Sequence, residues 1–195
     1  MRRAMPAIVA VCLAVSGCSG SPDDTTSADY QFVSPGGQTT IRYDPPDERK
    51  KVPPLTGESL TEPGQKISTA DYAGDVVVLN VWGSWCGPCR AETDDLERVY
   101  TATKDLGVRF LGINIRDENR SAAEDFVGNF EVSYPSLYDP PGRSMLVLKG
   151  FPRSVVPATI ILDREHRVAV VFLTALLEED LLPVVEEIAA EGTAR

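Results

Sequence analysis

The sequence predicts an α/β fold in which a βαβ unit is followed by a ββα unit. Residues 76–82 form an almost unbroken apolar run, which is typical of a central strand covered on both faces. A helical pattern follows at 86–105, and a second buried strand is expected at 108–115. Near the end of the chain, apolar segments at 160–162 and 167–173 flank a short turn and indicate a β-hairpin that leads into a last helix.

A helix and a strand are expected between these two halves. The helix is predicted to begin at Ser121, where Glu124 would complete a capping box, and to end near Phe130. A short strand at 136–138 and a short helix at 143–149 follow it. These elements would form an insertion at the centre of the domain.

The last helix is predicted from an apolar face at helical spacing, formed by Leu181, Val185 and Ile188. Pro183 interrupts this pattern, and we expect it in the first turn because a proline there removes no helical hydrogen bond. With 195 residues, of which 43% are hydrophobic, the chain is long enough for one domain with a substantial core.

The first residues predict an export signal that ends in a lipidated cysteine. Arg2 and Arg3 precede an apolar segment at 4–15, which is too short to span a bilayer as a helix. The next residues, Val-Ser-Gly-Cys ending at Cys18, resemble the bacterial lipobox, in which the cysteine is lipidated and the chain is cut before it. We therefore expect residues 1–17 to be a lipoprotein signal peptide. A plain signal peptide that leaves Cys18 free is the alternative.

Residues 18–54 are predicted to form a tether, a β-hairpin and a proline-rich connector. The hairpin is indicated by apolar segments at 32–33 and 39–41, which flank a Ser-Pro-Gly-Gly turn at 34–37. The main domain is therefore expected to span residues 55–195.

Two cysteines in the main domain are candidates for redox chemistry. Of the four cysteines in the chain, Cys12 lies in the predicted leader and Cys18 would be lipidated, so Cys86 and Cys89 remain as thiols. Two intervening residues bring the sulfurs within disulfide range across one helical turn. Cys86 would occupy the N-terminus of a helix, where free amides and the helix dipole stabilise a thiolate. We predict that Cys86 is the solvent-accessible nucleophile and that Cys89 resolves the intermediate.

The two residues between the cysteines suit this chemistry. Pro88 fits the first helical turn, and Gly87 leaves the approach to the sulfur open. A zinc site is the first alternative, but it lacks ligands because His166 is the only histidine and no second cysteine pair exists. A structural disulfide is the second alternative, but so short a loop constrains the unfolded chain little.

The sequence LNVWGSWCGPCRAE at residues 79–92 resembles the thioredoxin superfamily and, more closely, its membrane-tethered TlpA/ResA-like branch. The segments 110–114 and 156–159 and the predicted insertion are also similar, so the resemblance covers about residues 55–190. It implies a thioredoxin-like fold with a central helix–strand insertion, here preceded by an N-terminal β-hairpin extension. It also implies a reductant of disulfides in exported client proteins, which in several family members serves cytochrome c assembly. An integral-membrane electron donor would reduce the protein again.

The resemblance also identifies groove residues. Pro157 matches the family's cis-proline, which would place the backbone of Val156 beside the sulfurs, where a client strand can pair with it. Trp85 is expected to shape the same groove together with Gly87 and Pro88.

Two positions depart from the family pattern. Asn80 stands where thioredoxins carry a buried aspartate, and Asp94 replaces a proline that bends the helix in this branch. Because Glu92 lies three residues after Cys89, its carboxylate would share a helix face with that sulfur and could take over the proton transfer. An exposed Glu92 that only favours the helix dipole is the alternative.

The net charge and the small number of cysteines and histidines argue against other classes of function. The formal net charge of −10 argues against a nucleic-acid partner, and no cofactor or metal is expected. A disulfide oxidant or isomerase on the same site remains open, although the Gly-Pro pair lacks the histidine of oxidising relatives. A copper-delivery protein would need a wider cysteine spacing and a distal histidine, and a non-catalytic lipoprotein would leave Cys86 and Cys89 unexplained.

Overall fold

The computed structural model describes residues 30–33 and 36–191. In these residues, eight strands form one mixed sheet in the order β1-β8-β7-β4-β5-β6-β2-β3. The strands are β1 (Thr40–Arg42), β2 (Thr56–Ser59), β3 (Lys66–Ser68), β4 (Val76–Trp82), β5 (Val108–Asn114), β6 (Ser136–Tyr138), β7 (Ala158–Leu162) and β8 (Val168–Phe172). The α-helices are α1 (Gly87–Thr103), α2 (Arg120–Asn129) and α3 (Glu178–Ala190).

The centre of the sheet has the predicted βαβ and ββα arrangement of a thioredoxin-like fold. β4 pairs in parallel with β5, and α1 connects them. β7 pairs antiparallel with both β4 and β8, which confirms the C-terminal hairpin. The insertion is also confirmed, because α2 and β6 lie between the two halves and β6 pairs in parallel with β5.

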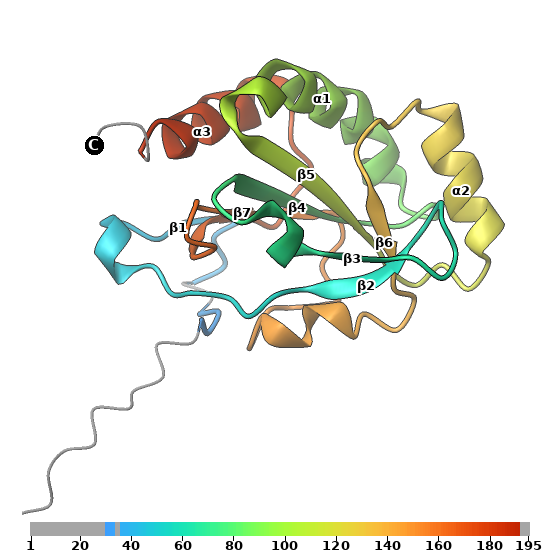
Figure 1. Ribbon diagram of the computed structural model, residues 1–195, viewed down its shortest axis with the longest axis horizontal. Coiled ribbons are helices and arrows are strands. Elements are labelled where there is room, and N and C mark those ends of the chain that lie inside the picture. Colours follow the sequence, from blue (N-terminus) through green and yellow to red (C-terminus); the bar gives the residue numbers. More distant parts are fainter. Residues whose placement is uncertain (1–29, 34–35, 192–195) are drawn as a thin grey trace, which may run out of the picture.

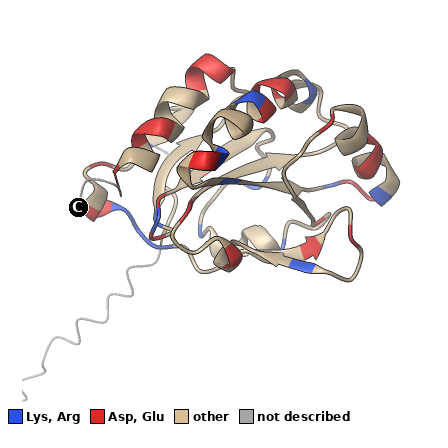
Figure 2. Ribbon diagram, turned by 45° about the horizontal axis from the view of Figure 1, so that its top comes forward, with Lys and Arg blue, Asp and Glu red and all other residues tan. Residues whose placement is uncertain are grey.

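Each face of the sheet has its own core. α1 and α3 lie side by side on one face (Figure 1), where Leu96 and Val185 pack against alternate residues of the central strands, such as Val78. The opposite face is covered by the N-terminal segment and by the residues around a 3-10 helix at Ser144–Val147. Because β4 is buried along its whole length, its apolar run needs no alternation. Acidic residues outnumber basic ones on the helices (Figure 2).

The predicted N-terminal hairpin is wrong. β1 pairs with β8 at the edge of the main sheet, and Gln31 forms a bridge with Lys149. The local pattern correctly indicated an extended segment at 39–41, but the exposed edge of β8 offered a better partner than the neighbouring segment. The predicted domain boundary at residue 55 stays a prediction, as does the signal peptide at 1–17 with Cys18, which lies outside the described residues.

Two helix details differ from expectation. Asn119 caps α2 by accepting a hydrogen bond from the backbone N–H of Ser121, so Ser121 is not the cap and the capping box with Glu124 does not form. Pro183 lies in the interior of α3 rather than in its first turn. It is exposed, so water can satisfy the carbonyl group that loses its helical donor.

The hairpin of β2 and β3 was not predicted. β2 pairs with β6 and extends the sheet beyond the insertion. Its sequence, Thr-Gly-Glu-Ser, carries little strand propensity, so its conformation follows from the pairing. No helix in the described ranges is both long and apolar enough to cross a bilayer.

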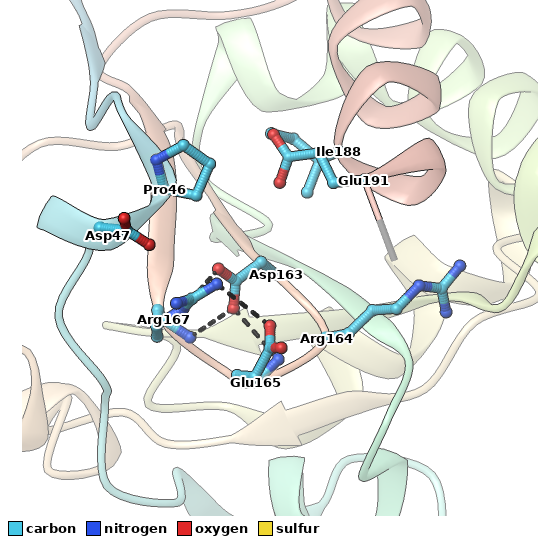
Figure 3. Close-up of a pocket in the computed structure, with 8 residues that line it drawn as sticks. All are labelled: Pro46, Asp47, Asp163, Arg164, Glu165, Arg167, Ile188 and Glu191. Carbon is cyan, nitrogen blue, oxygen red and sulfur yellow. Dashed lines mark hydrogen bonds and ion pairs between the residues drawn. The ribbon is translucent and has the colours of Figure 1, made fainter. Parts of the chain in front are cut away.

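A cluster of ion pairs lies beyond the end of β7, at the edge of the sheet where β4 begins. The side chain of Arg49 is fully buried there and donates two hydrogen bonds to Glu191, at 2.6 and 2.8 Å. It also contacts Asp44 at 2.9 Å and Asp163 at 3.5 Å. Arg167 donates to Asp163 at 2.8 Å beside a pocket of about 330 Å³ (Figure 3). This cluster ties the N-terminal connector to the β7–β8 turn and the end of α3.

Candidate active site

The two cysteines lie at the junction between β4 and α1. β4 ends at Trp82, the chain turns through three residues, and Cys86 then forms the N-cap of α1. A disulfide joins Cys86 to Cys89, as the spacing predicts. The sulfur of Cys86 also accepts a hydrogen bond from the backbone N–H of Cys89 at 3.2 Å. The same helix-end amide would stabilise a thiolate on Cys86.

Cys86 is less exposed to solvent than the sequence predicted. Cys86 is 3% exposed and Cys89 is 1% exposed, so in the oxidised form neither sulfur has the solvent access expected for Cys86. Gly87 and Pro88 are exposed, and a Cβ added at Gly87 would meet no atom within 4 Å. Because Gly87 has no side chain, it does not block the approach of an attacking thiolate to the Cys86–Cys89 disulfide.

The two tryptophans beside the cysteines have different environments. Trp82 is buried in a cluster with Cys86, Cys89 and Phe126, and it donates to Ser136 Oγ at 3.3 Å, so it is a packing residue. Trp85 is 48% exposed and forms part of the surface beside Cys86. Its role in a client groove stays a prediction.

Sequence reasoning missed the loop that holds Trp85. The Trp85 indole N–H donates to the carbonyl of Ile115 at 3.2 Å, and the guanidinium of Arg116 lies 4.6 Å from the centre of the Trp85 ring. Arg116 also donates to the carbonyl of Ser154 at 3.2 Å. The loop after β5 therefore contacts both the residue before Cys86 and the segment that leads to Pro157.

Asp117 on the same loop fixes the turn before the cysteines. Its buried carboxylate accepts hydrogen bonds from the backbone N–H of Ser84 at 2.7 Å and from the Ser84 hydroxyl at 2.6 Å. Asn114 donates to the same carboxylate at 2.6 Å. The carboxyl ends of the parallel strands β4 and β5 lie at the same end of the sheet. A polar residue just after β5 could therefore have been predicted to lie near the cysteines.

Glu92 is buried rather than exposed. It is 1% exposed, and its carboxylate accepts a hydrogen bond from Asn80 Nδ2 at 3.0 Å and another from the backbone N–H of Leu176 at 3.0 Å. Burial raises its pKa to about 7, although both hydrogen bonds oppose the shift. The exposed-glutamate alternative is therefore wrong. Asn80, which replaces the family's aspartate, contacts the acid that lies on the helix instead.

Two predictions about the segment at Val156 and Pro157 can be compared with the structure. The peptide bond between Val156 and Pro157 is cis. Val156 is partly buried and packs against the cluster that contains Cys86 and Cys89. His166 lies elsewhere, in the β7–β8 turn, with Nε2 at 3.1 Å from the carbonyl of Tyr72.

Known proteins are similar to this chain in sequence and in fold. A sequence model of the Redoxin family matches residues 47–187. A "Thiol-disulfide oxidoreductase ResA" of Geobacillus kaustophilus is 30% identical over 118 residues, which are 60% of this chain and 66% of that protein. The ResA of Bacillus subtilis is 29% identical over 61% of this chain and 64% of its own length. The matched segment thus spans slightly less than two thirds of each of these relatives.

Two solved structures match more of the chain. A "Secreted Thiol-disulfide Isomerase" from Corynebacterium glutamicum is 43% identical, has a TM-score of 0.80, and covers 83% of this chain and 98% of its own. A "DsbF homologue" from Corynebacterium diphtheriae is 46% identical, with a TM-score of 0.77 and coverages of 82% and 99%.

A thioredoxin-like fold that carries a Cys-x-x-Cys disulfide at the start of its first helix defines the class of thiol–disulfide oxidoreductases. Within that class, the chain belongs to the Redoxin family.

Proposed function

We propose that this protein reduces disulfides of exported client proteins outside the bacterial cytoplasm. The observation that carries the proposal is the Cys86–Cys89 pair at the N-terminus of α1, which directly follows the exposed Trp85 and packs against Val156. No other cysteine lies in the described residues, so the pair has no alternative partner there.

The exchange takes place in two steps that transfer two electrons. The Cys86 thiolate attacks one sulfur of the client disulfide, so that a mixed disulfide forms and the other client sulfur leaves as a thiolate that takes up a proton. The Cys89 thiolate then attacks the sulfur of Cys86. This step releases the second client thiol and leaves the Cys86–Cys89 disulfide that the structure contains. The client gains two electrons and the protein loses them.

Glu92 supplies the base for the second step. Cys89 is buried and must lose a proton before it attacks, and Glu92 lies three residues further along the same helix, also buried. With a pKa of about 7, its carboxylate accepts and returns a proton near neutral pH. Asn80 and Leu176 hold the carboxylate in place by donating to its two oxygens.

The direction of electron flow separates this proposal from a second candidate. The relative from C. glutamicum is named an isomerase, and an oxidant or isomerase would use the same two cysteines. Reduction is favoured because no histidine lies between the cysteines and because a Glu92 carboxylate nearby disfavours a Cys86 thiolate. A weakly stabilised thiolate corresponds to a reducing pair.

Location and partners complete the proposal. The predicted lipid on Cys18 would anchor the protein to a bacterial membrane with its domain outside the cytoplasm, and an integral-membrane electron donor would reduce the Cys86–Cys89 disulfide after each turnover. Clients would be exported proteins with disulfides, including apocytochrome c during cytochrome c assembly. The C. glutamicum relative is named a secreted protein, which agrees with an extracytoplasmic site.

Trapping experiments test the order of attack. Cys89→Ser leaves the attacking thiol without a resolving thiol, so it should accumulate mixed disulfides with clients, whereas Cys86→Ser should accumulate none. Both variants would be purified from cells after acid quenching and compared on non-reducing gels. The reverse pattern would contradict the assigned roles.

A second measurement decides the direction. Equilibration of the purified protein with glutathione gives the reduction potential of the Cys86–Cys89 pair. A potential near that of thioredoxin supports a reductant, and one near that of DsbA supports the second candidate instead.

A further inference from the structure

Arg116 and Arg153, which lie near the active site, lack acidic partners, whereas six of the eleven arginines in the described part of the chain have them. In the described part of the chain, six arginines form ion pairs with carboxylates: Arg42, Arg49, Arg98, Arg109, Arg120 and Arg167. Arg116 contacts only the Trp85 ring and the backbone carbonyl of Ser154 through its guanidinium. Arg153 is exposed and forms no ion pair or hydrogen bond through its side chain within residues 30–33 and 36–191.

These two arginines line one pocket, which we name the arginine pocket. It has a volume of about 340 Å³ and is open to solvent. Its walls come from three loops and contain no carboxylate. They are formed by Ile115, Arg116, Pro140, Pro141, Gly142, Arg153 and Ser154.

The two buried carboxylates closest in sequence to the pocket do not neutralise it. Asp117 is bound by Ser84 and Asn114, as described above. Asp139 accepts hydrogen bonds from the backbone N–H groups of Arg143 and Ser144 and from the Ser144 hydroxyl. The guanidinium groups of the pocket therefore keep their charge available in a protein whose formal net charge is −10.

The arginine pocket adjoins the place where a client would bind. Arg116 lies against Trp85, the residue before Cys86, and Ser154 lies two residues before Val156. A client strand that pairs with Val156 while its cysteine meets Cys86 would bring neighbouring side chains to this pocket. Each residue of an extended chain advances about 3.3 Å, so positions one to three residues from the client cysteine are within reach.

We propose that the arginine pocket binds a carboxylate side chain, aspartate or glutamate, that lies near the attacked cysteine of the client polypeptide. The proposal rests on the proposed function, because it names a feature of the clients of the same site. Carboxylates suit the pocket because a guanidinium presents several N–H donors in one plane to two oxygens. A lysine at the same client position would meet two like charges.

Matched peptides test the proposal directly. Each peptide carries one cysteine joined by a disulfide to 2-mercaptoethanol, and glutamate, glutamine or lysine occupies one of the three positions on either side of it. The protein is reduced beforehand and freed of reductant, and the rate constant for release of the peptide thiol is measured by chromatography. At one or more positions the glutamate peptide should react about fivefold faster than the glutamine peptide, as expected for an exposed ion pair. Half-molar salt should reduce this ratio.

Variants assign the preference to the pocket. Arg153→Gln should bring the glutamate-to-glutamine ratio close to one, and Arg153→Glu should favour the lysine peptide. Lys66→Gln is the matched control, because it removes one positive charge from an exposed residue of the edge strand β3 and should keep the wild-type ratio.

The failures of the two proposals are distinguishable. Equal rates for glutamate and glutamine peptides at every position would overturn the arginine pocket while leaving the reductase intact. A preference that survives in both Arg153→Gln and Arg116→Gln would also overturn it. If none of the peptides is reduced, the proposed function itself fails.

Discussion

Glu92 and Arg49 are both buried charged residues, but they have opposite surroundings at opposite ends of the central strands. Arg49 contacts three carboxylates, from Asp44, Asp163 and Glu191. Glu92 contacts no cation in the described part of the chain and accepts hydrogen bonds from the neutral groups of Asn80 and Leu176. The first arrangement favours a permanent charge. The second makes the charged and neutral forms nearly equal in free energy at neutral pH, which is what a proton carrier requires.

The same contrast separates the arginine pocket from the pocket beside Asp163. Beside Asp163, Arg167 is held by carboxylates of Asp163 and Glu165 (Figure 3). In the arginine pocket, the walls that surround Arg116 and Arg153 contain no carboxylate. Arg49 and Arg167 thus have carboxylate partners, whereas Glu92, Arg116 and Arg153, where chemistry and recognition are proposed, have no partner of opposite charge in the described residues. Each prediction below tests one side of this contrast.

The largest effect is expected for Glu92→Gln, measured as a pH-dependent stability difference. The folded protein raises the pKa of Glu92 from 4.5 to about 7, so it binds a proton more tightly than the unfolded chain does. The free energy of unfolding of the wild type should therefore fall as pH rises from 5 to 8, whereas a glutamine at this position has no proton to lose. The variant should gain about 2.5 kcal/mol relative to the wild type across that range.

Urea unfolding of the oxidised proteins at several pH values provides the measurement, because the disulfide removes cysteine titration. Asp94→Asn is the control, since it removes an exposed carboxylate from the same helix. Parallel pH profiles for Glu92→Gln and the wild type would show that Glu92 does not titrate in this range. The reduced proteins would then be tested for the rate of client reduction, which should fall only in Glu92→Gln.

The next largest effect is expected for Arg49→Met, at the other end of the central strands, where the free energy of unfolding should fall. Removing one partner of a buried ion pair costs about 3–5 kcal/mol, but Glu191 and Asp44 remain partly solvated, so we expect about 2 kcal/mol. Reductase activity of the folded protein should not change, because Arg49 touches no residue of the active site.

Arg42→Met is the matched control for this variant. Arg42 pairs with Asp44 and Glu187, but all three side chains are at least one third exposed. Its loss should cost less than about 1 kcal/mol. Equal losses for Arg42→Met and Arg49→Met in thermal or urea unfolding would mean that burial of the Arg49 cluster contributes nothing.

The sequence predicted those parts of the molecule that local pattern determines. β4, α1 and β6 were placed closely because their apolar runs or spacings are continuous, and the Cys86–Cys89 site followed from the helix end. Glu92 could be expected near Cys89 because both belong to one helix.

Features that depend on contacts between distant segments were missed or wrong. The partner of β1 is β8, more than a hundred residues away, so the local turn signal at 34–37 misled the assignment. The contact of Arg116 with Trp85 exists only because two loops meet at one sheet edge. Exposure of Cys86 was overestimated for the same reason, since residues from several elements cover it.

The smallest predicted effect concerns the N-terminus of α2, where the sequence predicted Ser121 as the cap. The structure assigns the cap to Asn119, whose side chain accepts from the backbone N–H of Ser121 at 3.1 Å. Asn119→Ala should therefore lower the free energy of unfolding by about 1 kcal/mol, since a backbone donor loses its partner. Ser121→Ala keeps that backbone donor and should cost at most a few tenths of a kcal/mol, because Ser121 Oγ donates only to the exposed Asn119 side chain. Urea unfolding compares the two variants. A larger loss in the free energy of unfolding for Ser121→Ala would show that Ser121 is the cap, as the sequence alone suggested.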